Sequence, residues 1–273
     1  MNATMLAAPD LDAAADLALQ AAARLWYGVA VIGATLFALA ATAVTLQAAT
    51  GIDVDAWSRF MAGTDPAGRG LASSMLAATA LAAAIVCGSV GLQLLPRMRA
   101  ASPRFQRCNA AALPALASAA AVVTLALAAA RVDGQDAVQL APQVLGAILV
   151  LVFAEKARGA ALAGDRLDQR IALLRVALVA GAPWLARAGF MLWVLVNQGP
   201  VGFDPGSVEG PAIALFGFGG VLVPLVILDA YLFAQASATR PARLGMAVAL
   251  LAFTALAGGG IVAAALGVWL PLA

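Results

Sequence analysis

Seven long apolar runs, each nearly free of charge, are the feature of this sequence that most constrains its fold. Each holds about 20 or more residues, the length that crosses the hydrocarbon core of a bilayer as a helix. Because lipid offers no water to backbone polar groups, such runs must satisfy their hydrogen bonds internally. They also lack the period-two alternation of barrel strands. The expected spans are 25–49, 71–95, 110–130, 138–157, 176–197, 211–236 and 245–271.

These runs predict an all-α, polytopic membrane helix bundle with seven transmembrane helices. Hydrophobic residues make up 63% of the chain and charged residues 11%, whereas soluble domains are roughly half apolar and a quarter charged. We expect two parts, an N-terminal cytoplasmic or interfacial helix over 1–24 and a seven-helix transmembrane domain over 25–273. Asp12 and Asp16 suit the beginning of that first helix, where the helix dipole favours acidic side chains.

The basic residues predict the orientation, because short cytoplasmic loops collect Lys and Arg. Twelve of the 16 Lys and Arg residues fall at Arg24 or in the segments 96–109, 155–175 and 237–244. With seven spans these positions share one side, so we expect a cytoplasmic N-terminus and an outside C-terminus. The predicted location is the bacterial inner membrane. The four arginines of 96–109 are interpreted first as a topology anchor, with binding of acidic lipids as the alternative.

Three charged side chains in or near the expected spans are candidates for a functional site, because burying charge in lipid costs at least ~2.5–3.5 kcal/mol. Arg187 lies in the fifth span and Asp229 in the sixth. We expect these two to pair or to face a polar cavity. Glu155, at the inner end of the fourth span, is a competing partner for Arg175 or Arg187. Such a pair would either fix helix packing or form a substrate, proton or quinone site.

Glycine and proline in the last two spans allow two interpretations. Transporters use helices broken at Gly or Pro to bind substrate near the midplane, whereas glycines also let helices approach closely. The sequence shows no convincing inverted repeat, so close packing is favoured. The residues concerned are Gly217, Gly219, Gly220, Pro224, Gly258, Gly259 and Gly260.

The composition excludes several kinds of chemistry. The chain has no histidine and two cysteines, which removes Ser-His-Asp and Cys-His catalysis and the usual zinc sites. It carries no P-loop and no Rossmann glycine pattern. A net charge of only +2, with arginines confined to short loops, argues against nucleic-acid binding. We therefore expect no enzymatic activity, no metal and no cofactor.

Two short motifs carry a resemblance to a known family. The first is the stretch GSVGLQLLPRMRAASPRFQR from Gly88 to Arg107, and the second is LDQRIALLR, with Arg170 and Arg175 five residues apart. Together they resemble the multi-pass bacterial membrane family catalogued as domain of unknown function 2306. Arg187, and Pro224 followed by Asp229, are similar to further features of that family. The resemblance covers residues 71–236.

The resemblance bears on cofactors, because the family has a histidine in each motif and those histidines invite a haem or metal site. In this sequence Gln106 precedes Arg107, and Gln169 precedes Arg170, where the family has His-Arg. Glutamine is a poor ligand for haem iron or zinc. The resemblance thus implies that any such cofactor is lost and that Arg107, Arg170 and Arg175 are scaffold residues. It carries no firmly assigned activity.

Three functional hypotheses follow. The first is a non-catalytic accessory or structural subunit of a larger membrane complex, whose partners are the lipid bilayer and other membrane protein subunits. The second is a small-molecule or proton transporter that uses Arg187 and Asp229 beside a broken sixth span. The third is a quinone- or haem-associated redox membrane protein descended from a histidine-bearing ancestor.

Overall fold

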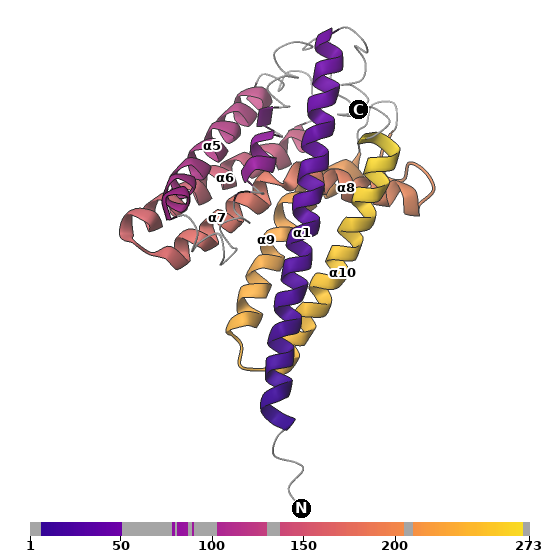
Figure 1. Cartoon of the computed structure of the whole chain (residues 1–273). Helices are drawn as coiled ribbons and strands as arrows, with labels where there is room; N and C mark the ends of the chain where they lie inside the picture. The colour runs from indigo at the N-terminus through magenta and orange to yellow at the C-terminus, as the bar shows by residue number, and fades with distance from the viewer. Residues whose placement is uncertain are drawn as a thin grey trace, which may run out of the picture.

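The computed structural model describes residues 7–50, 78–79, 81–86, 89, 103–129, 137–204 and 210–269. Its elements, shown in Figure 1, are α1 (Ala7–Thr50), α5 (Pro103–Ala129), α6 (Ala137–Ala163), α7 (Arg166–Ala180), α8 (Ala182–Val196), α9 (Pro211–Ala236), α10 (Arg240–Ala264) and the π-helical turn η2 (Ala265–Trp269).

Helices long and apolar enough to cross a membrane make up most of the described chain. In the described residues, five helices are long and apolar enough to cross a membrane, or six spans if the bent pair α7–α8 counts as one. The regular structure in the described ranges is helical, and the chain is an integral membrane protein. The expected span 71–95 lies mostly outside the described residues, so the count of seven stays a prediction. One residue of it, Val86, is fully buried in the core.

Helix α1 is continuous across the expected boundary between an interfacial segment and a first span. The helix runs without a break from Ala7 to Thr50, and its apolar stretch covers Leu11–Val44. The start of the first span at residue 25 therefore stays a prediction. Residues before Arg24 already lie against another apolar helix.

That neighbour is α10, which packs parallel to α1 over most of its length (Figure 1). Leu19 and Ala22 share a buried cluster with Ala247 and Leu250. Further along, the ring of Phe37 meets that of Trp269, with their centroids 5.8 Å apart. Because residue numbers rise together along both helices, the beginnings of α1 and α10 lie at the same end of the bundle.

The expected fifth span, 176–197, is bent in the structure. Helix α7 ends and α8 begins on either side of Gly181, and the two axes differ by 48°. Proline removes a backbone hydrogen bond from a helix interior but fits the first turn of a new helix, and Pro183 lies in the first turn of α8. The Gly-Ala-Pro sequence at this point therefore ends one helix and begins the next.

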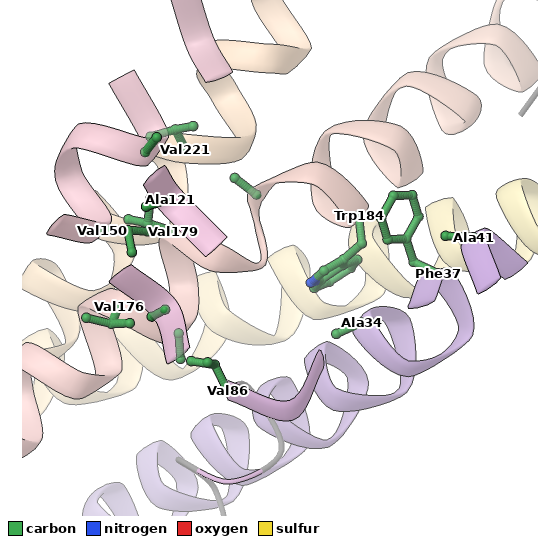
Figure 2. Packing of buried hydrophobic residues seen from close by; sticks show 14 of the residues in the cluster. Ala34, Phe37, Ala41, Val86, Ala121, Val150, Val176, Val179, Trp184 and Val221 are labelled. Atoms are coloured by element: carbon green, nitrogen blue, oxygen red, sulfur yellow. The ribbon is translucent and has the colours of Figure 1, made fainter. Parts of the chain in front are cut away.

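The core is built from small and branched side chains contributed by most of the described helices. Val150, Val179 and Val221 bring α6, α7 and α9 together (Figure 2). Trp184 of α8 is the bulky exception and lies beside Ala34 and Phe37 of α1 (Figure 2). Small side chains let helices pack closely where lipid provides no hydrophobic driving force between them.

Glycines in α9 and α10 mark the closest approaches between helices. A Cβ on Gly220 would lie 2.8 Å from the carbonyl oxygen of Ala182, and one on Gly217 would lie 2.8 Å from Cγ of Pro142. A Cβ on Gly260 would collide with the backbone carbonyl of Ala188. Helix α9 continues through Pro224 without a break. The close-packing interpretation is therefore confirmed at these three glycines, and the break in the sixth span that the transporter alternative assumes is absent.

Candidate functional site

An ion pair between α7 and α9 is the polar feature that stands out among the apolar helices. Arg175 Nη2 donates a hydrogen bond to Oδ1 of Asp229 over 2.7 Å. The side chain of Asp229 is 60% exposed in the isolated chain and that of Arg175 is 28% exposed. The carboxylate therefore lies open on the surface of a helix that is otherwise apolar.

Helix α6 completes the surroundings of Arg175. The guanidinium carbon lies 5.7 Å from the centroid of the Phe153 ring, within the range in which a cation is attracted to an aromatic face. The ammonium of Lys156 lies 6.0 Å from the same ring. Phe153 and Asp229 thus hold Arg175 from two helices, which fixes the guanidinium at the meeting of α6, α7 and α9.

The position of Asp229 along α9 explains why this pair differs from an ordinary surface salt bridge. Asp229 comes seven residues before Ala236, where the helix ends, a distance of about 10 Å at 1.5 Å per residue. A long side chain such as Arg can reach back toward a membrane surface from that depth, whereas the short Asp side chain cannot. Within a bilayer the Asp229 carboxylate would therefore face the apolar region.

Arg187 is not the partner that the structure gives to Asp229. Ala186, its neighbour in α8, lies against Gly220, and Asp229 follows Gly220 by nine residues, or about 13 Å along α9. The expected pair therefore joins the wrong arginine to the carboxylate, and Arg175 takes that place. Arg187 itself is partly buried, next to Ala188 at the contact with α10.

Glu155 also has a different partner from those expected. Its carboxylate accepts two hydrogen bonds from Arg158, one turn further along α6, with Nε–Oε2 at 2.9 Å and Nη2–Oε1 at 2.5 Å. Both side chains are exposed. Such an i,i+3 pair forms within one helix and needs no tertiary contact. Glu155 is therefore bound to Arg158 rather than to Arg175 or Arg187.

A second set of ion pairs joins the beginning of α1 to the beginning of α10. Arg240 binds Asp12 through two hydrogen bonds, with Nε–Oδ1 at 2.5 Å and Nη2–Oδ2 at 3.1 Å. Arg243 binds Asp16, with Nη1–Oδ1 at 2.8 Å. We call these four residues the α1–α10 clamp. They place the acidic start of α1 beside the basic segment 237–244, on one side of the bundle.

Arg243 ties the clamp to the connection between α9 and α10 as well. Its Nε and Nη2 donate to the carbonyl oxygen of Ser237 over 3.0 and 2.7 Å. The Ser237 hydroxyl in turn accepts from the backbone N–H of Thr239. Sequence reasoning assigned Asp12 and Asp16 to the helix dipole and the two arginines to membrane topology. It missed their pairing, because the partners are more than 220 residues apart and no local pattern links them.

The glutamines of the family-like motifs lie near the beginnings of two helices. Gln106 and Arg107 belong to the first turns of α5, and Gln169 and Arg170 to those of α7. Since α6 returns beside α5, and α7 beside α6, both motifs lie at the same end of this three-helix layer. Gln169 is partly buried and Arg170 is exposed. The side chains of Gln106 and Arg107 lie outside the described part of the chain.

The chemistry open to the site follows from these partners. Arg175 occupies one oxygen of Asp229, and a carboxylate has lone pairs for further donors, so the site can accept a proton or a hydrogen bond. Within the described ranges, no three Cys, Asp or Glu side chains are grouped to hold a metal ion.

Comparisons of the chain with protein-family models, with curated proteins and with solved structures find no match.

Proposed function

We propose that this chain is a non-catalytic subunit of a larger complex in the bacterial inner membrane. The observation that supports this role is the open ion pair of Arg175 and Asp229 on an apolar membrane helix. Arg175 contacts this carboxylate, yet 60% of the Asp229 side chain stays exposed. A second membrane protein would cover that carboxylate.

The energetic reason is the cost of charge in lipid. Insertion scales assign a central Asp about +2.5 to +3.5 kcal/mol, and pairing with Arg175 offsets only part of that, because the second oxygen still loses its water. Polar side chains in membranes face the bundle interior, a water-filled cavity or another protein. Of these, the outward direction of Asp229 favours another protein.

The size of the native particle tests the proposal. The tagged chain is expressed at native level, its membranes are solubilised in a mild detergent, and the particle is sized on a native gel. We expect a particle larger than that formed by the same chain overproduced alone, which is the matched control. Migration of the native sample with the overproduced chain, at the size of one 27.3 kDa polypeptide in its micelle, contradicts a subunit role.

The motif glutamines support a second part of the proposal, that the chain holds no haem or metal at the end where α5 and α7 begin. Glutamine replaces both motif histidines of the family that the chain resembles, and it is a weak donor for iron. An absorption spectrum of the protein purified from its own membranes tests this. A Soret band that survives gel filtration contradicts the proposal and favours the redox alternative.

The bend at Gly181 supports a transporter as the second candidate function. It separates the helix of Arg175 from that of Arg187, and broken helices bind substrates in many transporters. Proton uptake into liposomes, followed with a pH-sensitive dye, tests this for the simplest substrate. If the wild type takes up protons and Asp229→Asn does not, while both fold equally well, the transporter replaces the subunit. Equal dye signals from wild type and empty liposomes favour the subunit.

A further inference from the structure

The outward surface of α9 carries a regular stripe that includes Asp229. Successive members of the stripe are alternately four and three residues apart. This gives the average spacing of 3.5 residues by which two helices pack along a common seam. Apart from Gly219 and Asp229 its members are exposed, bulky and apolar. We call this set the α9 seam: Leu215, Gly219, Leu222, Val226, Asp229 and Phe233.

The opposite surface of α9 shows what a packed seam looks like in this chain. Val221, Pro224 and Leu228 are buried there, and Gly217 and Gly220 bring the helix against α6 and α8. That surface is therefore already covered by other helices of the chain. The α9 seam has the same mixture of a glycine and bulky apolar side chains, but no helix of the described chain covers it.

Gly219 is the first residue that points to a missing neighbour. A Cβ built on it would meet nothing within 4 Å, so no contact within the described chain requires glycine at this position. Glycine is unfavourable in a helix relative to alanine, and its established use in membranes is to let another helix approach closely. Open glycines also occur away from the seam, as at Gly258, so Gly219 supports an approach from outside through its place on the same stripe as Asp229.

Asp229 is the residue that distinguishes the seam from other exposed apolar surfaces. Arg175 donates to Oδ1, which leaves the carboxylate able to accept another hydrogen bond. Arg175 also balances its charge, so the site favours a neutral or weakly basic donor rather than a second carboxylate. A helix seated on the seam would bring such a donor to the exposed part of Asp229.

We propose that the α9 seam is the docking surface for a transmembrane helix of a different protein, which places a hydrogen-bond donor against Asp229 and a bulky apolar side chain against Gly219. This inference rests on the proposed subunit role and specifies where and how the partner binds. The partner helix carries a Ser, Thr, Asn, Gln, Tyr or basic side chain at the level of Asp229.

A second copy of this chain fits the seam poorly. All copies cross a membrane in the same direction, so two α9 helices would pack parallel and each seam residue would face its equivalent. Asp229 would then lie against Asp229, and two carboxylates at this depth repel each other. The charge pattern therefore favours a partner of different sequence.

Two glycine variants test the seam without disturbing the fold. Gly219→Leu fills the open space and should block the partner helix. Gly258→Leu in α10 is the matched control, since a Cβ there also meets nothing within 4 Å. We expect both overproduced chains to elute like wild type, and only Gly219→Leu to lose the large native particle. Retention of that particle by Gly219→Leu overturns the docking surface while the subunit role stands.

Photo-crosslinking in native membranes tests the contact directly. A photoreactive residue is placed at Val226 in the seam or at Val248 in α10, side chains that are both 66% exposed. We expect an adduct with one other polypeptide from position 226, none from 248, and a decrease of about tenfold or more when Asp229→Leu is added. Asp229→Asn, which keeps the shape and can still accept a hydrogen bond, should retain more of the adduct.

The partner's own sequence completes the test. Mass spectrometry must place the adduct in a membrane-spanning helix with a donor at the matching level, and replacing that donor by an apolar residue must lower the same adduct. Several outcomes overturn the inference: adducts with lipid only, with a second copy, within the chain itself, or equally from position 248. If the wild type has no large native particle, the subunit role fails first.

Discussion

Trp26 of α1 and Phe253 of α10 contact each other at one level of two parallel helices, with ring centroids 4.6 Å apart and ring planes inclined by 40°. This contact lies between the α1–α10 clamp at one end and the contact of Phe37 with Trp269 at the other. It follows that the beginning of α1 and the end of α10 lie at opposite ends of the helix bundle.

The parallel packing predicts the outcome of a topology measurement. Alkaline phosphatase, active only outside the cytoplasm, is fused at the C-terminus or inserted between α9 and α10 at residue 238. The positive-inside rule and the clamp together predict activity for the C-terminal fusion and none for the insertion. Activity of both fusion proteins, or of neither, would show that α10 does not cross the membrane as α1 does.

Two neighbouring glycines of α10 should respond very differently to alanine. Gly260→Ala places a methyl group against the backbone carbonyl of Ala188, so α8 and α10 must separate, which we expect to cost about 1–3 kcal/mol. Gly258→Ala enters open space and should be neutral or slightly stabilising, because alanine favours the helix. Thermal unfolding of the purified chains in detergent compares the two, and equal midpoints would contradict the close contact.

The α1–α10 clamp predicts that its two arginines contribute unequally to the stability of the fold. Arg243→Ala removes a partner from Asp16 and two hydrogen bonds from the Ser237 carbonyl, and we expect it to destabilise by about 1–3 kcal/mol. Arg240→Ala, whose side chain is 38% exposed against 17% for that of Arg243, should have the smaller effect. The apparent unfolding temperature measures the order, and the reverse order would argue against the clamp.

The ion pair of Arg175 and Asp229 predicts a rescue by double substitution. Arg175→Leu leaves the carboxylate alone, and Asp229→Leu leaves the guanidinium alone, so each single variant should be destabilised. Replacing both charges by apolar residues is often neutral or stabilising, so the double variant should recover. The unfolding midpoints of the wild type, the two single variants and the double variant form a double-mutant cycle. A double variant less stable than either single variant would disprove the pairing.

Much of the helical framework could be predicted from the sequence, because helix formation in lipid depends on length and apolar composition. The expected spans 211–236 and 245–271 correspond closely to α9 and to α10 with η2. The role of Gly217, Gly220 and Gly260 in close packing also followed from residue type, since glycine has few other uses in a continuous membrane helix. The family resemblance stays a prediction.

The partners of the charged residues could not be predicted in the same way. Arg175 and Arg187 are both on the chain segment that precedes α9, and only the packing of α7 and α8 against α9 shows which of them reaches Asp229. The bend at Gly181 had a local signal in Pro183, two residues after the glycine. No local signal in the sequence indicated the length of α1, because its polar first turns pair with Arg240 and Arg243 at the far end of the sequence.

The mass of the intact particle released from native membranes tests the central claim most directly. Native mass spectrometry from lipid nanodiscs weighs the chain together with whatever protein remains bound. The predicted result is 27.3 kDa plus the mass of at least one different polypeptide, lost when Gly219→Leu is introduced and retained with Gly258→Leu. A mass of one chain, or of a whole multiple of it, would contradict the claim that another membrane protein covers Asp229.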